Sequence, residues 1–383
     1  MGPLAGLKVV EAGGIGPVPF CGMLLADMGA EVTLIERRCD GEGAAGIPKG
    51  PRGAEIVHRG KKSIALDLKT PQGAAAALRL AAHAGVLVEG FRPGVMERLG
   101  LGPEPCLEAN PRLVYGRLSG WGQDGPLAQA AGHDIDYIAL SGALFHGGHE
   151  HAPPAAPATM IGDLGGGAML LATGILAALL HARQSGKGQV VDAAISDGAV
   201  LLTTLLVGLQ QQGRWSDRRQ ANLLDGGAPW YDCYECADGG YVAVGALEPQ
   251  FYREFVEKCG LGDDFSFASQ YDSAAWPRQK KRLAALFRAR SRDEWAAHFA
   301  GSDACVAPVL NLSEARAHPH HLARSAYTQI DGIPQPAPAP RFGATPGRAG
   351  GRPPAPGEHT VEVLSAAGFS RADIAALRAA EAI

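Results

Sequence analysis

The segment GHDID at residues 132–136 places a histidine between a glycine and two carboxylates. Gly132 lets the backbone approach a ligand closely, while Asp134 and Asp136 can fix the tautomer of the His133 imidazole or raise its basicity. An imidazole in this setting is suited to acid/base catalysis near neutral pH. The alternative is a structural histidine whose hydrogen bonds are satisfied within the fold.

A second carboxylate, Asp163, precedes three glycines in the sequence GDLGGG and opens a long apolar segment. An aspartate in this position commonly caps a helix N-terminus. It is also suited to act as a base, because the bare backbone N–H groups of residues 165–167 could receive an oxyanion beside it.

Basic residues gather in two places. Arg37 and Arg38 follow the apolar run EVTLIE, and RGKKSIALDLK covers residues 59–69. A guanidinium offers paired donors to a phosphate and a lysine offers a mobile point charge. These residues suit a phosphate-bearing ligand, and a solvated basic loop is the alternative.

The elements that must position these residues alternate between strand and helix. Apolar runs rich in β-branched residues (LKVVEA, EVTLIE, SIALDL, VLVEGF and LVYGRLSGW) are separated by Ala- and Leu-rich segments up to residue 190. This alternation predicts an α/β fold with a parallel sheet, in which ligands bind at the carboxyl ends of the strands. Residues 164–180 are slightly short for a membrane span and predict a buried helix.

Capping and composition signals mark the remaining elements. Thr70 followed by Pro71 predicts a helix start, and Ser370 with Asp373 predicts a capping box. A second region beginning near residue 224 reads as a strand followed by three helices. Residues 333–357 are so rich in Pro and Gly that we expect an extended connector.

The first strand and turn invite a dinucleotide-binding interpretation. The turn GGIGPVPF, however, carries Pro19 where the third glycine of the G-x-G-x-x-G fingerprint belongs, and Pro17 stiffens it further. A nicotinamide cofactor is therefore disfavoured.

Composition limits the partners and the compartment. The 383 residues are 46% hydrophobic with a net charge of −4, so bulk attraction to nucleic acid or an anionic membrane is not expected. Seven cysteines, scattered and odd in number, and a start without a signal peptide are typical of reduced thiols in a cytoplasmic protein.

No metal site is predicted. The pair CYEC at residues 233–236 has no second cysteine pair, and its cysteines would face opposite sides of a strand. The clusters HGGHEH (146–151) and HPHH (318–321) lack the helical H-E-x-x-H pattern and predict exposed loop histidines.

Six motifs, two of them already described, make the chain resemble the family III CoA-transferase superfamily by their order and spacing. The resemblance covers essentially the whole length of the chain, and within the superfamily it is to the racemases of 2-methylacyl-CoA. The motifs are GHDIDY (132–137), IGDLGGG (161–167), GKGQVVDA (186–193), LDGGAPWYDCYECADG (224–239), VGALEPQFY (244–252) and SDACVAPVL (302–310). The resemblance implies that His133 and Asp163 are the acid/base pair and that Glu248 orients the histidine. It implies no cofactor, because CoA is part of the substrate.

The implied reaction removes the α-proton of a 2-methylacyl-CoA from one face and returns a proton to the other. Two bases on opposite sides are needed, and an imidazole and a carboxylate can alternate as base and acid around an enolate. The resemblance also assigns CoA binding to residues after successive strands: Arg37, Leu66, Asp67, Leu68, Lys69, Gly90, Phe91, Arg92, Arg98, Gly132, Asp134, Ile135, Asp136 and Tyr137.

Two departures from the family pattern stand out. The loop between Arg37 and RGKKS, at residues 39–58, is longer than in close relatives, so the adenine end of the site could differ in shape. Asp136 replaces the usual asparagine, and the extra carboxylate should raise the basicity of His133.

The resemblance further implies an interlocked homodimer of two-domain α/β chains. We expect a large Rossmann-like CoA-binding domain at residues 1–195, a linker helix at 196–225, a small α+β domain at 226–320, and a connector at 321–383 that returns to the large domain. Glu248 would then act on His133 of its own or of the partner chain.

Three alternatives remain on sequence grounds. A family III CoA-transferase would use Asp163 as the nucleophile of an acyl anhydride. A nicotinamide oxidoreductase and a catalytically silent CoA-binding protein are the others. The acyl group, whether a sterol side chain, a branched fatty acid or a smaller 2-methyl acid, is not encoded in any recognisable residue.

Overall fold

The computed structural model describes residues 2–37 and 51–383, and the chain folds into two compact units. The first unit comprises Met1–Ser141, Pro157–Leu202 and His320–Ile383, and the second comprises Gly142–Ala156 and Thr203–Pro319. The short segment Gly142–Ala156 therefore leaves the first unit just after the GHDIDY motif and belongs to the second. The first part of the unusually long loop, residues 38–50, lies outside the described residues.

A parallel sheet forms the centre of the first unit, as the alternation of apolar runs predicts. Its strand order among the described residues is β3-β2-β1-β4-β5-β6, and every neighbouring pair is parallel. This order reverses direction between β1 and β4, which is the point where doubly wound folds bind ligands. The strands are β1 (Lys8–Ala12), β2 (Glu31–Glu36), β3 (Lys62–Ala65), β4 (Val86–Glu89), β5 (Val114–Ser119) and β6 (Gln189–Ala194).

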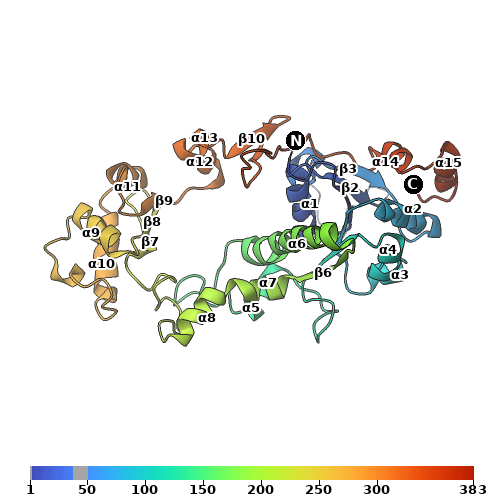
Figure 1. The fold of residues 1–383 in the computed structure, drawn as a ribbon. Helices are drawn as coiled ribbons and strands as arrows, with labels where there is room; N and C mark the ends of the chain where they lie inside the picture. The colour runs from blue at the N-terminus through green and yellow to red at the C-terminus, as the bar shows by residue number, and fades with distance from the viewer. Residues whose placement is uncertain (1, 38–50) are drawn as a thin grey trace. The chain divides into compact units, whose positions relative to one another are not determined.

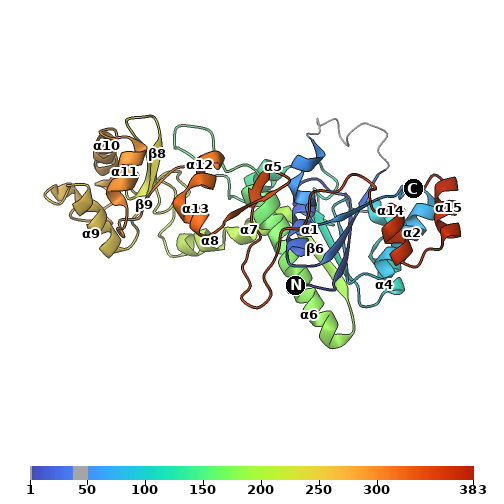
Figure 2. The ribbon, with the colours of Figure 1, turned by 90° about the horizontal axis from the view of Figure 1, so that it is seen from above.

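Helices cover both faces of this sheet because successive strand residues point to opposite sides (Figures 1 and 2). Val9 packs with α1 and α6, whereas Val10 packs with α2, α4, α14 and α15. The helical segments of the first unit are α1 (Pro17–Asp27), α2 (Pro71–Ala82), α3 (Val95–Arg98), α4 (Pro103–Ala109), α5 (Asp134–Leu140), α6 (Leu170–Ser185), α7 (Ile195–Leu202), α14 (Thr360–Ala366) and α15 (Arg371–Ala379), with the 3-10 turns η2 (Arg52–Ala54) and η3 (Ile56–His58).

The predicted helix starts are confirmed. The Thr70 hydroxyl accepts a hydrogen bond from Gly73 N–H at 3.0 Å, and Pro71 is the first residue of α2. Ser370 and Asp373 form a reciprocal capping box at the start of α15. The Pro-rich connector begins with a strand that its composition does not predict: β11 (Ile333–Pro336), which pairs antiparallel with the preceding strand β10 (Tyr327–Ile330).

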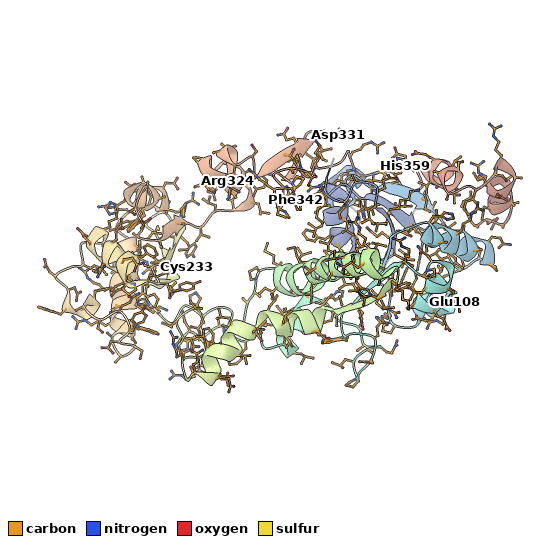
Figure 3. All side chains as sticks on the ribbon, viewed as in Figure 1. Glu108, Cys233, Arg324, Asp331, Phe342 and His359 are labelled. Carbon is orange, nitrogen blue, oxygen red and sulfur yellow. The ribbon has the colours of Figure 1, made fainter. Side chains whose placement is uncertain are left out.

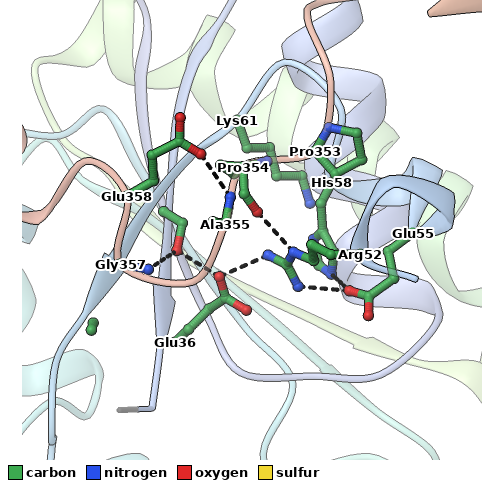
Figure 4. A network of polar contacts seen from close by, with 12 residues as sticks. Glu36, Arg52, Glu55, His58, Lys61, Pro353, Pro354, Ala355, Gly357 and Glu358 are labelled. Carbon is green, nitrogen blue, oxygen red and sulfur yellow. Dashed lines mark hydrogen bonds and ion pairs between the residues drawn. The ribbon is translucent and has the colours of Figure 1, made fainter. Parts of the chain in front are cut away.

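The C-terminal segment covers the free edge of β3. Ser63 N–H donates to the Nδ1 atom of His359, a residue labelled in Figure 3, and Ala65 N–H donates to Thr360 Oγ1 at 3.0 Å. Figure 4 shows how the neighbouring loop is tied in: Arg52 Nη2 donates to Glu36 Oε2 at 2.8 Å and its Nε donates to the Pro354 carbonyl. Edge donors that would otherwise be open to another strand are thus satisfied.

The long apolar segment after Asp163 forms one continuous helix of two types. It begins as the π-helical stretch η4 (Met160–Met169) and continues as α6. By length and composition alone Met160–Ser185 could cross a membrane. Leu171, Ile175 and Ala178 pack into the core of the first unit, whereas Met169 and Leu180 on the same helix are more than half exposed. The prediction of a buried helix is therefore right for one face only.

The second unit has its own aromatic core around a three-stranded antiparallel sheet in the order β7-β8-β9. Trp230, Phe255 and Phe287 are almost completely buried there. Its elements are α8 (Thr204–Gln211), β7 (Tyr231–Glu235), β8 (Tyr241–Gly245), α9 (Pro249–Lys258), η5 (Phe265–Phe267), α10 (Trp276–Phe287), α11 (Arg292–Phe299), β9 (Val306–Pro308) and α12 (Leu312–Ala317), and α13 (Pro319–Ala323) follows at the sequence boundary.

Two buried ion pairs correct the interpretation of RGKKS as a phosphate-binding strip. Arg59 forms a paired contact with Asp27, with an Nη2–Oδ2 distance of 2.5 Å. Lys61 lies against both carboxylate oxygens of Glu11, at 2.9 and 2.7 Å, and also donates to the Pro19 carbonyl. Both cations are therefore committed inside the first unit and are not available to a ligand.

Replacing Lys61 with methionine should lower the free energy of unfolding by about 3–5 kcal/mol, because Glu11 would keep a buried carboxylate without its partner. Chemical denaturation of the first unit's transition measures this change. Lys62→Met is the matched control: Lys62 pairs with Glu362 at an exposed site, where an ion pair contributes about 0–1 kcal/mol. Equal destabilisation by the two substitutions would contradict the assignment.

Candidate active site

The residues expected to bind CoA follow successive strands of the parallel sheet. Arg37 directly follows β2, residues 66–69 follow β3, and residues 90–92 follow β4. The carboxyl ends of parallel strands meet at one edge, so the fold brings these three segments to the same side of the sheet. Segment 132–137 comes after β5, the next strand in the order.

The exposed members of the segments that follow β2, β3 and β4 are basic. Arg37, Lys69, Arg92 and Arg98 all have exposed side chains. Leu66, in contrast, is 1% exposed and packs in the core, and its backbone N–H donates to the Glu36 carbonyl, so its predicted contact with CoA stays a prediction. The edge therefore presents guanidinium and ammonium groups, which suit the phosphates of CoA.

Loop residues between the strand ends have structural tasks of their own. Asp67 Oδ1 accepts the Lys69 N–H at 2.9 Å, and its carbonyl accepts the Thr70 hydroxyl at the start of α2. Phe91 N–H donates to Glu89 Oε2 at 2.8 Å. A Cβ on Gly13 would collide with the Phe91 ring, so that ring fills the space beside the β1–α1 turn.

His133 lies at the N-cap position of α5, with an exposed side chain. The Asp136 carboxylate accepts the backbone N–H of His133 at 2.9 Å, and Asp136 N–H donates back to the His133 carbonyl. Asp136 is thus occupied in capping the helix. The expected effect of this carboxylate on the basicity of His133 stays a prediction.

Gly132 has a packing role, and its expected close approach to a ligand stays a prediction. A Cβ at this position would lie 2.8 Å from the Tyr137 ring and 3.0 Å from Trp121 Nε1, and the Tyr137 hydroxyl donates to the Gly132 carbonyl. The Trp121 and Tyr137 rings pack edge to face. These contacts fix the turn that carries His133, while Ile135 on the same helix is 60% exposed.

A buried carboxylate joins the two catalytic motifs. Asp134 is 8% exposed, and its Oδ1 accepts the backbone N–H of Asp163 at 2.7 Å. A Cβ on Gly162 would lie 2.7 Å from that same oxygen, so glycine is required there for the contact. The hydrogen bond sets the main chain at Asp163 relative to the start of α5, one residue after His133.

The surroundings of the Asp163 carboxyl favour its uncharged, protonated form. Burial raises its pKa to about 6, the charge of Asp134 adds to the rise, and the charge of His133 opposes it. A Cβ on Gly16 would lie 3.9 Å from Asp163 Oδ2, so the carboxyl faces the glycine-rich turn between β1 and α1. An acid with this pKa can both accept and donate a proton near neutral pH.

The three glycines after Asp163 serve helix packing, which corrects the expectation of an oxyanion site at residues 165–167. A Cβ on Gly166 would lie 2.7 Å from Ala199 N, and a Cβ on Gly198 would lie 1.9 Å from the Gly166 carbonyl. The backbones of η4 and α7 are therefore in direct contact. Inside a π-helix each N–H also donates to the carbonyl five residues earlier, so these amides are already committed.

Glu248 belongs to the second unit, at the N-cap of α9 with an exposed side chain. Its predicted partner His133 belongs to the first unit. The orienting role of Glu248 stays a prediction.

Within the cysteine cluster and within the first histidine cluster, the residues differ in their burial. Cys233, labelled in Figure 3, is exposed on β7, whereas Cys236 lies in the core of the second unit. His149 and His151 are exposed as expected, but His146 is not: it packs edge to face with Trp215 and accepts that indole N–H at 3.1 Å. Within residues 2–37 and 51–383 no three potential ligands gather as a metal site.

Sequence reasoning missed two features beside the site. The Asp134–Asp163 hydrogen bond joins residues 29 apart in the chain. Glu89 and Arg117, both buried, form an ion pair at the carboxyl ends of β4 and β5. Their signal is visible in the sequence, because each is a charged residue inside an otherwise apolar strand.

The chain matches the description "CoA-transferase family III" over residues 4–360. It is 45% identical to alpha-methylacyl-CoA racemase of Mus musculus and 43% identical to that of Homo sapiens, each match covering 97% of this chain and 95% of the relative. It is also 31% identical to succinyl-CoA–D-citramalate CoA-transferase of Chloroflexus aurantiacus, over 100% of this chain and 98% of that one.

Solved structures agree with this relationship. A CAIB/BAIF family protein from Brucella suis aligns with a TM-score of 0.80 at 26% identity, covering 96% of this chain and 99% of that one. A hypothetical protein from Mycobacterium tuberculosis aligns with a TM-score of 0.80 at 27% identity, covering 95% and 99%. The chain belongs to CoA-transferase family III.

Asp134→Asn should lower the pKa of Asp163 below its value of about 6, because the asparagine oxygen still accepts the Asp163 N–H while the neighbouring negative charge is gone. Carbon-13 NMR titration of the aspartate carboxyl groups measures the change directly. Any rate that needs ionised Asp163 should then persist to lower pH.

Asp136→Asn is the matched control for this titration. The Asp136 carboxylate caps the His133 N–H and is not among the charges that shift Asp163. Its replacement should leave the Asp163 titration in place. Identical titrations of Asp163 in the wild type and in Asp134→Asn would show that the Asp134 charge does not tune it.

Proposed function

We propose that this protein is an isomerase that interconverts (2R)- and (2S)-2-methylacyl-CoA thioesters by two-base proton transfer through an enolate. The observation that carries the proposal is the Asp163 carboxyl with a pKa of about 6, within electrostatic reach of His133 at the carboxyl edge of the sheet. The identity of 43–45% with two proteins named alpha-methylacyl-CoA racemase supports it.

The reaction divides between the two groups. With the α-proton facing Asp163, the ionised carboxyl removes it while protonated His133 donates a proton to the opposite face, and the roles exchange for the other enantiomer. Because one residue cannot serve both faces of an enolate without the substrate turning in the site, two groups are required. These residues supply the proton transfers themselves, so the proposal includes no metal and no cofactor beyond the CoA of the substrate.

The basic edge would hold the CoA part of the substrate. Arg37, Lys69, Arg92 and Arg98 are exposed there, and the charge of Arg92 is felt by Tyr137 of the GHDIDY motif. Arg92 thus links the segment after β4 to the segment that carries His133. This arrangement supports a thioester whose phosphates lie on the basic residues and whose α-carbon reaches the acid/base pair.

A homodimer is part of the proposal. Several large apolar side chains of the first unit remain more than half exposed, a larger number than isolated surface residues explain. They are Ile135, Leu140, Met160, Met169, Leu180, Val200, Leu201 and Leu202. Burial against a second copy of the chain would remove this surface from water, and Glu248 of either copy would orient His133.

A CoA-transferase is the second candidate, and the match to family III favours it at the level of the family. In that reaction Asp163 would attack the thioester carbonyl, release CoA as the thiolate, and carry the acyl group as an anhydride. The nearby His133 favours proton transfer instead, since an imidazole is suited to return a proton to the substrate.

Each pure enantiomer of a 2-methylacyl-CoA should exchange its α-proton and racemise with the wild-type protein in deuterium oxide, as measured by proton NMR. His133→Ala should abolish racemisation in both directions and retain exchange only for the enantiomer whose proton faces Asp163. Asp163→Ala should retain the opposite preference.

Equal exchange of both enantiomers by both variants would refute the two-base assignment. Hydroxylamine trapping distinguishes the transferase: an acyl hydroxamate formed at Asp163 during turnover with a second acid would assign that residue as a nucleophile. Wild-type protein that labels Cα without an acyl acceptor supports the racemase.

Glu248→Gln should lower kcat by about 10- to 100-fold with little change in KM, because the orienting carboxylate acts through His133 and does not contact the CoA part. Steady-state kinetics with one enantiomer measures both constants. Glu257→Gln, an exposed glutamate of the same helix α9, is the control and should keep wild-type kcat. A Glu248→Gln variant with unchanged kcat excludes the orienting role.

A further inference from the structure

A charged network lies beneath two of the basic segments at the carboxyl edge of the sheet. Glu89, the last residue of β4, is 1% exposed, and Arg117 of the neighbouring strand β5 is 8% exposed. The two residues are register partners, and Arg117 Nε donates to Glu89 Oε1 at 3.2 Å. Arg117 Nη2 also donates to Oε1 of Glu97 on α3 at 2.8 Å.

Each end of this network holds a segment that carries an exposed arginine. The second oxygen of Glu89 accepts the Phe91 N–H at 2.8 Å, and Arg92 is the next residue. Glu97 immediately precedes Arg98, whose Nη1 lies 3.3 Å from where a Cβ of Gly94 would be. Among the described residues Arg117 alone bonds to both carboxylates, so it ties the segment after β4 and helix α3 to the sheet.

The burial of these charges needs an explanation beyond stability. A buried ion pair is on balance often no more stabilising than apolar residues of the same volume, because both charges lose their hydration. Burial raises the pKa of Glu89 to about 7 despite its bonds to Phe91 N–H and Arg117. The network therefore adds little to the stability of the core, but its hydrogen bonds hold the segment after β4 and helix α3 in defined positions.

We propose that Arg117 is a positioning residue for CoA recognition: through Glu89 and Glu97 it holds Arg92 and Arg98 in place for the phosphates of CoA. The inference deepens the proposed function and rests on it for the identity of the ligand. The positive charge of Arg117 has a second effect. Without it, the negative charges of Glu89 and Glu97 would repel the phosphates of CoA without compensation. Arg117 itself does not contact the substrate.

Glu97→Gln and Arg117→Lys test this role. The Glu97 side chain is 44% exposed, so its replacement by the isosteric amide should leave the fold intact. We expect the dissociation constant for free CoA, measured by calorimetry, to rise about three- to tenfold in Glu97→Gln and at least as much in Arg117→Lys, since lysine cannot bridge two carboxylates in the planar geometry of arginine.

Arg59→Lys is the matched control, because Arg59 is also a buried arginine in an ion pair, and both it and its partner Asp27 precede strands, at the amino edge of the sheet. It should keep the wild-type CoA affinity. The same loss in Arg59→Lys and Arg117→Lys would mean that any buried ion pair of the first unit has this effect, and it would overturn the proposal. An unchanged affinity for CoA in Glu97→Gln would overturn it as well.

Kinetics with a shortened substrate separates positioning from general damage. In Glu97→Gln the KM for a 2-methylacyl-CoA should rise with kcat unchanged, and kcat/KM for the corresponding acyl-pantetheine, which lacks the nucleotide and its phosphates, should equal that of the wild type. Equal losses on both substrates would contradict a role in phosphate recognition. Because CoA binding is measured without turnover, a wild type that binds CoA but does not racemise would refute the proposed function and leave this inference standing.

Discussion

The hydrogen bond from the Asp163 N–H to the Asp134 carboxylate is the contact on which the site depends. It joins the start of η4 to the start of α5 and so fixes the separation of two groups that the chain places 30 residues apart. A charged acceptor strengthens the bond, and its burial protects it from water. The same charge helps to keep the Asp163 carboxyl close to neutrality. One side chain therefore fixes the backbone position of its neighbour and adds to the rise in pKa that burial causes.

The surrounding glycines make this arrangement possible because they have no side chain. Gly162 admits the Asp134 oxygen, and Gly166 and Gly198 let two helix backbones touch. Asp163 lies in the π-helical stretch η4, and π-helical turns are common at functional sites. The segment around Asp163 is thus defined by close backbone contacts, in which larger side chains would have no space.

Sequence patterns predicted the sheet, its helices and the two candidate acid/base residues, because strand periodicity, capping residues and residue chemistry are local signals. They failed where the answer depended on distant partners. Arg59 and Lys61 read as ligand-binding cations, yet their partners Asp27 and Glu11 lie 32 and 50 residues away and bury them. Local composition also failed at one place, because β11 forms within a Pro-rich stretch that it identifies as a connector.

The bonds from the C-terminal segment to β3 have a consequence for synthesis on the ribosome. His359 and Thr360 satisfy backbone donors of a strand made nearly 300 residues earlier, so the edge of the sheet stays open while the intervening second unit is translated. Contacts of such sequence separation form late, and an open strand edge invites pairing with other chains. During much of its synthesis the nascent chain therefore exposes the unpaired backbone groups of β3. Its yield in a cell should depend on how well chaperones protect that strand edge until the last residues emerge.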